Sequence, residues 1–342
     1  MNRRLLVVGA SGLVGSEVMR AASDPPEPLI APELEQKTRQ VLSLTPAEEA
    51  KLRGRLGIGS NPHPDRLAEG EGNSLKLRAW DTLGVARNVS GLATEAMDLL
   101  DPAAIQRVVD RFNPSAVVVA SAWPWVDGCE KDPERSYREN VQTVKNLLQV
   151  LGPQPRVVFF STEHVFDGLA PQYDEDSPTH PLSVYAKHKR EVEELLLARG
   201  GSLIARTSYV FGAEAKRKNF MYRVIDASEQ KTPLKVPSAQ AGMPTWSGWL
   251  AASSLELLRE GEEGIVHLTG PDVLTKAEWA RMLATGLALP DVEIIEVPWQ
   301  ESGQIAPRPE RVRLVSTRHE LKHPPLLELL TRERASLLAK VN

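Results

Sequence analysis

The sequence predicts an α/β fold in which a doubly wound parallel sheet, with helices on both faces, is followed by a smaller C-terminal lobe. Near the N-terminus, an apolar run at residues 5–8 leads into a glycine-rich turn and a helical pattern that ends near Ala22. Strand and helix patterns then alternate from about residue 80 to 205, which is typical of parallel sheets. After about Gly212 the alternation breaks up, which indicates a separate lobe.

The positions of individual strands and helices follow from the same patterns. Short apolar runs indicate buried strands, which we expect at residues 5–8, 80–87, 93–100, 116–120, 157–160 and 202–205. Helical periodicity predicts helices at residues 137–151 and 185–198, and Asp101 is placed to cap another. On the helix at 185–198 we expect Glu191, Glu193 and Glu194 to face outward.

The chain is expected to divide into a sheet domain at residues 1–22 and 75–212, an insertion at 23–74, and a C-terminal lobe that makes up most of 213–342. The insertion is rich in Pro and Gly, and its clearest local signal is a capping box at Thr45-Pro46-Ala47-Glu48. The sequence assigns the insertion no role. Within the C-terminal part, residues 264–270 are expected to return to the sheet as a strand, and residues 275–287 to form a helix.

Composition excludes several classes of protein. The 342 residues include 41 Lys and Arg against 45 Asp and Glu, and this net charge of −4 argues against nucleic-acid binding. Cys129 is the only cysteine, so the chain has no internal disulfide and no Cys/His cluster for a metal. The N-terminal apolar run is too short for a signal peptide, and no apolar stretch reaches the ~18 residues of a membrane span. We therefore expect a cytoplasmic protein, and the sequence leaves a homodimer open.

The glycine-rich turn indicates a dinucleotide site. Gly9 permits a tight turn after the strand, Gly12 allows a pyrophosphate to approach the backbone, and Gly15 allows the helix to pack closely on the strand. The N-terminus of the following helix favours the negative charge of phosphates. This strand, turn and helix predict a Rossmann-type domain.

The end of the second strand bears on the choice of cofactor. In Rossmann-type folds an acid at this position favours NAD, whereas an arginine accommodates the 2′-phosphate of NADP. Arg87 occupies it here with no acid beside it, so we expect NADPH, with NADH remaining open. Asp98, at the end of the third strand, is expected near the adenine, although a loop-capping role fits it equally well.

A second group of residues predicts carbonyl chemistry. Thr162 follows the fifth strand, and Tyr185 and Lys189 are spaced i and i+4 on a helix, so they share one face, whereas Lys187 points elsewhere. We expect the Lys189 ammonium to lower the pKa of the Tyr185 phenol from about 10 toward neutrality. Tyr185 would then donate a proton to the developing alkoxide, and Thr162 would hydrogen-bond the same oxygen.

Several motifs in order carry a resemblance to a known family. They read GASGLVG, STEHVFDG, PLSVYAKHK, ARTSYVFG, KNF and GMPTW. Together they resemble the dTDP-4-dehydrorhamnose reductase family of extended short-chain dehydrogenases/reductases, over residues 1–21 and 80 to about 320. The regulatory beta subunit of methionine adenosyltransferase has a similar outline.

The resemblance implies a role for particular residues. It implies that Thr162, Tyr185 and Lys189 are catalytic, that Lys189 also reaches the nicotinamide ribose, and that Asn140 lies near the active site. The implied cofactor contacts are Gly9, Ser11, Gly12, Leu13, Val14, Arg87, Asp98, Leu99, Ala120, Ser121, Ala122, Tyr185 and Lys189. The implied substrate contacts are Trp123, Val126, His164, Tyr209, Asn219 and Arg308.

The sequence also departs from this family. Trp123-Pro124-Trp125 stands where smaller residues are usual, Glu163 where aspartate is usual, and His164 where tyrosine is usual. These positions lie near the sugar or the nicotinamide, so the exact substrate stays open. Packing of the two tryptophans against the C-terminal lobe is an equally good explanation for them.

The resemblance implies an NADPH-dependent reductase of a nucleotide-linked 4-keto sugar, with Tyr185 as the proton donor. Two alternatives remain. One is an NADP-binding regulatory subunit without turnover. The other is a sugar-nucleotide epimerase or dehydratase on the same scaffold, although a dehydratase would require an Asp-Glu pair after Thr162, where only Glu163 stands.

Overall fold

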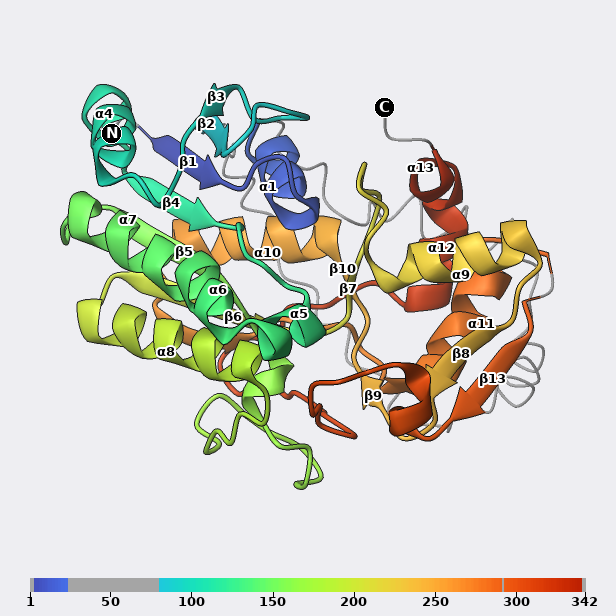
Figure 1. Ribbon diagram of the computed structural model, residues 1–342. Helices are drawn as coiled ribbons and strands as arrows, with labels where there is room; N and C mark the ends of the chain where they lie inside the picture. Colours follow the sequence, from blue (N-terminus) through green and yellow to red (C-terminus); the bar gives the residue numbers. More distant parts are fainter. Residues whose placement is uncertain (1–2, 24–79, 291, 340–342) are drawn as a thin grey trace. The chain divides into compact units, whose positions relative to one another are not determined.

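The computed structural model describes residues 3–23, 80–290 and 292–339. Except for Ser23, the expected insertion with its capping box at residues 45–48 lies outside these residues. The described part contains one large sheet, flanking helices and a group of shorter elements from the C-terminal part of the chain (Figure 1).

The large sheet has seven parallel strands in the order β11-β6-β5-β4-β1-β2-β3. They are β1 (Arg4–Val8), β2 (Asp81–Ala86), β3 (Glu95–Ala96), β4 (Ala116–Val119), β5 (Arg156–Thr162), β6 (Ser202–Thr207) and β11 (Gly264–His267). The chain order reverses between β1 and β4, which is where doubly wound sheets bind ligands. The predicted α/β, Rossmann-type sheet is confirmed, and β11 comes from the segment expected to return to it.

Helices cover both faces of the sheet because its strands are apolar on both sides. On one face, Leu5 and Val7 of β1 pack with α1 (Leu13–Ser23) and α10 (Ser247–Glu260). On the other, Leu6 and Val8 pack with the second group of helices. That group consists of α4 (Pro102–Phe112), α7 (Thr143–Leu151) and α8 (Val184–Arg199). Asp101 caps α4 as predicted, since its carboxylate accepts the Ala103 N–H at 2.9 Å.

The third strand is shorter than expected. The prediction of a strand over residues 93–100 was too long, because β3 pairs only with Val85 and Ala86 at the edge of the sheet. Beyond it the chain turns away, and the Asp98 carboxylate accepts the Leu100 N–H at 3.0 Å. Because β3 is the edge strand and β2 ends at Ala86, residues 98–100 have no neighbouring strand with which to form backbone hydrogen bonds.

The expected helix at 137–151 is also not uniform. It begins inside α6 (Pro133–Tyr137), which follows α5 (Val126–Lys131), and passes through a π-helical turn, η1 (Arg138–Gln142), before α7. Such π-helical turns occur often at functional sites. Here the turn contains Asn140.

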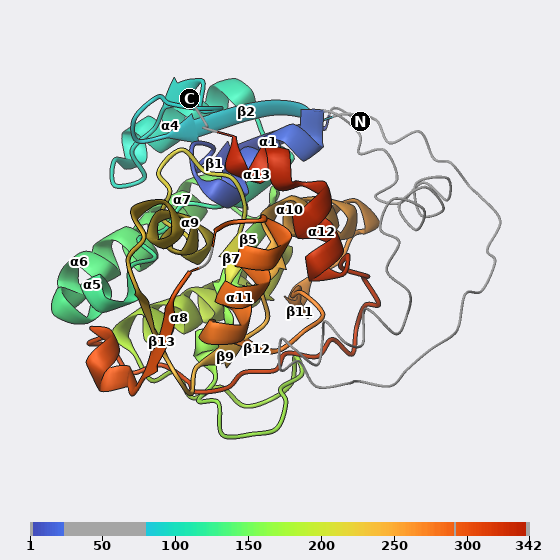
Figure 2. The same ribbon diagram turned by 90° about the vertical axis from the view of Figure 1, so that its right-hand side faces the viewer.

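Most of the elements that follow β6 form the C-terminal lobe, except α10 and β11, which belong to the sheet domain (Figure 2). Its helices are α9 (Phe220–Gln230), α11 (Lys276–Gly286), α12 (Leu326–Arg332) and α13 (Arg334–Leu338), with a short η3 (Trp299–Ser302). Its strand pairs are β8 (Leu234–Pro237) with β13 (Ile294–Val297), β9 (Ala241–Gly242) with β12 (Leu274–Thr275), and β7 (Val210–Phe211) with β10 (Thr245–Trp246). The helix expected at 275–287 is α11, which starts one residue later because Thr275 is its cap.

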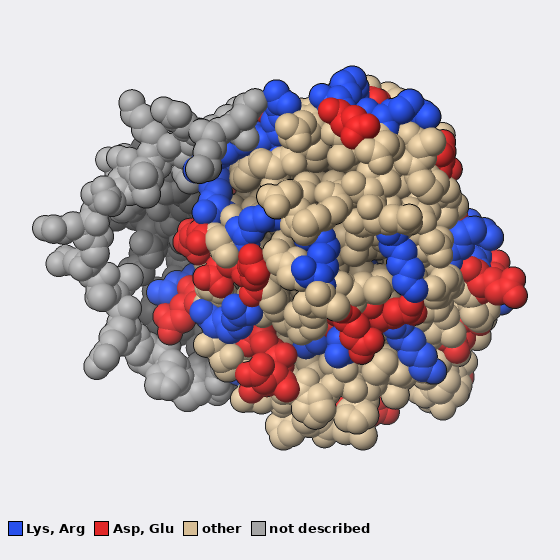
Figure 3. All heavy atoms as spheres, turned by 90° about the vertical axis from the view of Figure 1, so that its left-hand side faces the viewer, with Lys and Arg blue, Asp and Glu red and all other residues tan. Residues whose placement is uncertain are grey.

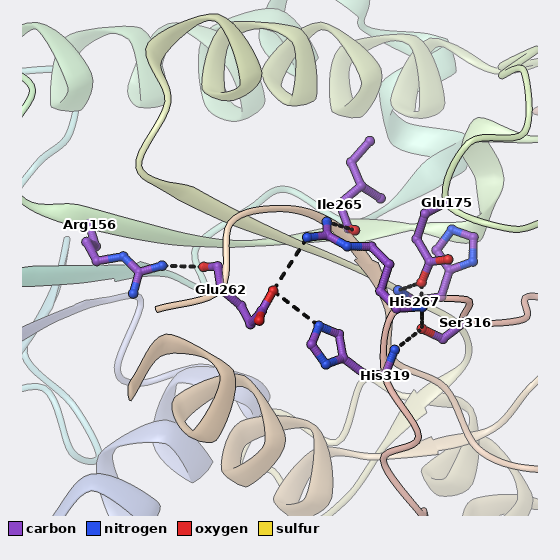
Figure 4. A network of polar contacts seen from close by, with 8 residues as sticks. Arg156, Glu175, Glu262, Ile265, His267, Ser316 and His319 are labelled. Atoms are coloured by element: carbon purple, nitrogen blue, oxygen red, sulfur yellow. Dashed lines mark hydrogen bonds and ion pairs between the residues drawn. The ribbon is translucent and has the colours of Figure 1, made fainter. Parts of the chain in front are cut away.

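A polar network ties the segment around residues 315–319 to the edge strand β11 (Figure 4). The Glu175 carboxylate accepts hydrogen bonds from the His267 backbone, from the Ser316 hydroxyl at 2.6 Å and from the Thr317 backbone at 3.0 Å. Burial raises the pKa of the Glu175 carboxyl, but these donors, led by Ser316, outweigh burial and lower the pKa to about 2. The network covers the outer edge of β11, which would otherwise leave its backbone groups unpaired.

Charged side chains of both signs occur on the side of the molecule that Figure 3 shows. On the face that carries α4, α7 and α8, acidic and basic side chains lie side by side (Figure 3). Among the residues that the structure describes, no helix is long and apolar enough to cross a membrane.

Candidate active site

A cavity of about 810 Å³ lies between the carboxyl ends of the central strands and the C-terminal lobe. The sheet contributes Ser161 and Thr162 from β5, Thr207 from β6 and the loop after β4. The lobe contributes Phe220, Arg223, Gln240, Lys276 and Arg308. The cavity therefore lies where ligands bind in folds of this kind.

The glycine-rich turn closes tightly against the end of β4. Gly9 has a φ of +86°, and a Cβ there would lie 2.7 Å from the Ser121 nitrogen. A Cβ on Gly15 would lie 2.2 Å from the Gly9 oxygen, so α1 packs against the turn itself. A bare backbone cradle at the N-terminus of α1 fits the phosphates of a dinucleotide. Ser11 lies in the turn, α1 begins at Leu13 and Val14, and Ala120 and Ala122 flank Ser121.

Arg87 directly follows β2 and is engaged by two carboxylates. Its Nη2 donates to Glu139 at 2.6 Å, and its Nε lies 3.6 Å from Asp98. The hydrogen bond with Glu139 is the main reason that the pKa of Arg87 is raised. Leu99 is buried, and its carbonyl accepts from Asn146 at 2.9 Å. Arg87 and Asp98 thus lie together, and Glu139 is a second carboxylate partner of Arg87 that the sequence did not indicate.

Thr162 and Tyr185 meet at the cavity. Thr162 is the last residue of β5, and Tyr185 is in the first turn of α8, which Ser183 caps. Both side chains line the cavity, and the Thr162 hydroxyl donates to the Glu163 carboxylate at 3.1 Å. The expectation of a lowered phenol pKa is wrong for this structure, because burial and the Glu163 carboxylate raise the pKa of Tyr185 above its usual value. The phenol is therefore protonated at neutral pH, as a proton donor must be.

Lys189 lies one turn further along α8, beneath the cavity and not in its wall. It is 5% exposed, and its ammonium donates to the Phe160 carbonyl at 2.8 Å. Burial lowers its pKa to about 8, although Glu193 and Cys129 oppose the shift. Lys187, by contrast, is exposed, as its spacing predicted.

The prediction that the acidic residues of α8 face outward holds for Glu194 and for the half-exposed Glu191 but is wrong for Glu193. Glu193 is fully buried, and its carboxylate accepts two hydrogen bonds from Arg206 of β6, at 2.9 and 2.8 Å, and one from Ser161 of β5, at 2.5 Å. The bidentate pair with a buried arginine makes burial of this charge tolerable. An arginine inside the apolar strand at 202–207 is the signal that could have pointed to a buried acid.

His164 follows Glu163 in the cavity wall. Its Nε2 lies 3.8 Å from the Glu163 carboxylate, and its ring is edge-on to Tyr185 at 6.2 Å. Burial lowers the pKa of His164 to about 3, so the imidazole is neutral. A neutral imidazole can orient a substrate but is a poor proton donor.

The loop after β4 is held by Asn140. Its side chain accepts from the Trp123 N–H at 2.8 Å and donates to the Trp123 carbonyl at 3.2 Å. Trp123 and Trp125 pack edge-to-face with ring centroids 6.3 Å apart, close over Gly128 of α5. Both tryptophans and Val126, the first residue of α5, line the cavity.

The remaining expected substrate residues divide into two groups. Tyr209 and Arg308 line the cavity; Tyr209 has a φ of +41°, and Arg308 pairs with Asp127 at 3.0 Å. Asn219 does not line it, because its side chain caps α9 by accepting the Met221 N–H and donating to Gly212.

Comparison with known proteins places this arrangement in a family. Residues 72–328 match the family described as the RmlD substrate binding domain. The chain belongs to that family.

Individual members and solved structures of related proteins agree with the assignment. The chain is 31% identical over 201 residues to a dTDP-4-dehydrorhamnose reductase of Aggregatibacter actinomycetemcomitans, covering 56% of this chain and 68% of that protein. It is 28% identical over 258 residues to methionine adenosyltransferase 2 subunit beta of Danio rerio, covering 72% and 79%. The fold matches a dTDP-4-dehydrorhamnose reductase of Bacillus anthracis in complex with NADP, with a TM-score of 0.72, 20% identity, and 97% and 98% coverage.

In this RmlD-family cavity, the structure also places residues that sequence reasoning missed. Lys276 and Arg223 come from α11 and α9 of the C-terminal lobe. The helix expected at residues 275–287 has Lys276 in its first turn, with no indication that this residue enters a site. A lysine at a helix N-terminus opposes the helix dipole, and this was the available signal.

Proposed function

We propose that this chain is an NADPH-dependent reductase of a nucleotide-linked 4-keto sugar, and hence an oxidoreductase that acts on C=O and CH–OH groups. The observation that carries the proposal is the presence of Thr162 and a protonated Tyr185 together in the wall of a large cavity. The names of family members, including the reductase of Aggregatibacter actinomycetemcomitans, support the same activity.

The cofactor would be held by the glycine turn and the end of β4. Gly9, Gly12 and Gly15 leave a backbone surface free of side chains at the N-terminus of α1, which suits a pyrophosphate. Bound NADPH supplies the hydride that reduces the keto carbon. NADH shares the pyrophosphate and nicotinamide, so the choice between the two depends on Arg87 and its partners at the end of β2.

The protein's own residues would then act on the substrate oxygen. Tyr185 donates its phenolic proton to the oxygen as negative charge develops there. Thr162 holds the same oxygen by a hydrogen bond. The buried ammonium of Lys189, one helical turn from Tyr185, would favour the negative charge that develops on the phenol only as the proton leaves.

A regulatory subunit without turnover is the second candidate, because one relative is a beta subunit of methionine adenosyltransferase. Oxidation of NADPH in the presence of a panel of nucleotide 4-keto sugars distinguishes the two. The reductase proposal expects a fall in NADPH absorbance with at least one sugar. NADPH binding without oxidation of any sugar in the panel would contradict it and favour the regulatory role.

A further inference from the structure

Two cations in the cavity form no direct ion pair in the described part of the chain. Within residues 3–23, 80–290 and 292–339, neither Lys276 nor Arg223 forms an ion pair, although both line the cavity. Arg308, the third cation from the lobe, is paired with the Asp127 carboxylate. Asp127 also accepts hydrogen bonds from the backbone N–H groups of Ile305 and Ala306. The lobe wall of the cavity therefore carries positive charge that no direct ion pair neutralises, although the Glu163 carboxylate on the sheet side acts on Lys276 from a greater distance.

The ammonium of Lys276 is fixed in place by aromatic rings. Its Nζ lies 3.2 Å from the ring centroid of Tyr209 and 4.7 Å from that of Phe220. Contact with ring faces stabilises a cation that has lost part of its hydration shell. The rings accept no proton in a conventional hydrogen bond, so the N–H groups of Lys276 remain available to a ligand.

The surrounding backbone is arranged to permit this contact. Tyr209 is held at a φ of +41°, an uncommon conformation for a residue with a side chain. A Cβ on Gly242 would lie 2.8 Å from the Tyr209 ring, so only glycine fits there. Conformations of this kind cluster at functional sites.

Lys276 also occupies an unfavourable helix position. It is the first residue of α11, directly after the Thr275 cap, where the positive end of the helix dipole disfavours a cation. Burial, together with Arg223 and Arg308, lowers the pKa of Lys276 to about 7, and Glu163 opposes that shift. An anion bound at this place would relieve the repulsion among the three cations.

We propose that Lys276 and Arg223 form an anion subsite in the cavity, which holds the phosphate groups of the substrate nucleotide. The inference rests on the proposed function and names the part of the substrate that the lobe recognises. Because Thr162 and Tyr185 line the sheet side of the same cavity, the keto sugar lies toward the sheet and the phosphates toward α9 and α11. The aromatic contacts make Lys276 a fixed charge, which reduces the entropy lost on binding.

Calorimetric titration of the full chain with dTDP, thymidine and inorganic pyrophosphate tests the subsite. We expect Lys276→Met and Arg223→Met each to weaken dTDP binding by at least about tenfold, the loss of one charge-assisted contact of about 1.4 kcal/mol or more. Thymidine lacks phosphate, so its affinity is expected to stay within about twofold. Pyrophosphate is expected to compete with dTDP, which identifies the phosphates as the recognised group.

Controls separate charge recognition from damage to the fold. Lys276→Arg keeps the charge and is expected to retain dTDP affinity within about fivefold, while Lys235→Met removes an exposed lysine outside the cavity and is expected to change nothing. NADPH affinity is expected to be unchanged in all four variants, which also shows that they are folded. Unchanged dTDP affinity in both methionine variants, an equal loss of NADPH affinity, or no dTDP binding by the parent chain would each overturn the inference.

The subsite and the reductase activity can be tested separately, because binding of dTDP requires no turnover. A chain that binds dTDP through Lys276 but oxidises NADPH with none of the keto sugars would retain the subsite and lose the reductase proposal. A chain that reduces a keto sugar while the variants keep their dTDP affinity would retain the reductase and lose the subsite.

Discussion

At the scale of single residues, Tyr185 differs most from what its spacing suggested. The sequence places Lys189 one turn away, yet the ammonium donates to the Phe160 carbonyl beneath the cavity. Burial and Glu163 raise the phenol pKa instead, so Tyr185 carries its proton before the substrate arrives. The arrangement favours reduction, in which the enzyme must give a proton, over oxidation, in which it must take one.

We expect Tyr185→Phe to lower turnover by about 10²- to 10⁴-fold, because it removes the proton donor, and to leave NADPH binding within a few-fold. Lys189→Ala is expected to reduce both, since it deletes a buried cation near the phenol and the cofactor. Stopped-flow or steady-state NADPH oxidation measures the first quantity and cofactor fluorescence the second. If Tyr185→Phe kept more than about a tenth of the turnover, another acid would be responsible. His164, neutral with its pKa at about 3, is unsuited to that role.

Changes at Arg87 and at its partner Glu139 are expected to shift the preference between NADPH and NADH in opposite directions. Its guanidinium is already bound by Glu139, whose charge competes with a 2′-phosphate. Arg87→Ala is therefore expected to lower the ratio of NADPH to NADH affinity, and Glu139→Gln to raise it, each by about threefold or more, equivalent to ~0.7 kcal/mol. Fluorescence titration with both cofactors measures the ratio. A ratio that moves in neither variant would show that the 2′-phosphate binds elsewhere.

At the scale of elements, helix α8 is fixed to the sheet by a buried ion pair. Glu193 of α8 bonds to Ser161 of β5 and Arg206 of β6, so one carboxylate connects three elements. Tyr185 and Thr162 belong to two of these elements. The pair therefore holds the helix that carries the phenol against the strand that carries the threonine.

We expect Glu193→Gln to lower the free energy of unfolding by about 3 to 5 kcal/mol, because it leaves Arg206 buried without a counter-charge. The matched control is Glu194→Gln on the same helix, whose exposed carboxylate pairs with Arg190 at 3.3 Å and is worth about 1 kcal/mol or less. Urea unfolding followed by circular dichroism measures both. Addition of Arg206→Met to Glu193→Gln is expected to restore part of the loss. Equal destabilisation by the two single changes would contradict this account.

At the scale of the whole molecule, the sheet domain closes without residues 24–79. The Trp80 N–H donates to the Ala22 carbonyl at 3.1 Å, so the described residues on either side of that segment are neighbours. The described strands, the glycine turn and the cavity all come from the rest of the chain. A short connection can therefore span the gap with little loop-closure entropy.

We expect a chain in which residues 24–79 are replaced by a short Gly-Ser linker to fold and to bind NADPH within a few-fold of the full chain. Gly9→Val in the same shortened chain is the control, because a Cβ there would lie 2.7 Å from the Ser121 nitrogen and would block the cradle. Fluorescence titration measures both. A shortened chain that folds but binds no NADPH would show that the segment contributes to the cofactor site.

The parts that the sequence predicted well are those coded by neighbouring residues. The strand, glycine turn and helix at residues 4–23, the cap at Asp101 and the spacing of Tyr185 and Lys189 depend on local geometry, which a short stretch of sequence fixes. The apolar strands imply a parallel sheet, and parallel strands bring their carboxyl ends to one edge. That is why the sequence alone could assign Thr162 and the helix that carries Tyr185 to one site, whereas Trp123 was implied only by the resemblance.

The tertiary structure alone decided which charges are buried and which remain free. Nothing in the spacing of Glu193 distinguishes it from Glu194, and its burial follows from Arg206 on a strand that is separate in sequence. Similarly, Lys276 becomes a candidate ligand group only because Tyr209 and Phe220 are folded against it. The sequence thus determined the sheet, the cofactor turn and the Thr-Tyr-Lys set through local patterns. Burial and electrostatics depend on residues brought together from distant segments, so the protonation of Tyr185 and the positive lobe wall required the folded chain.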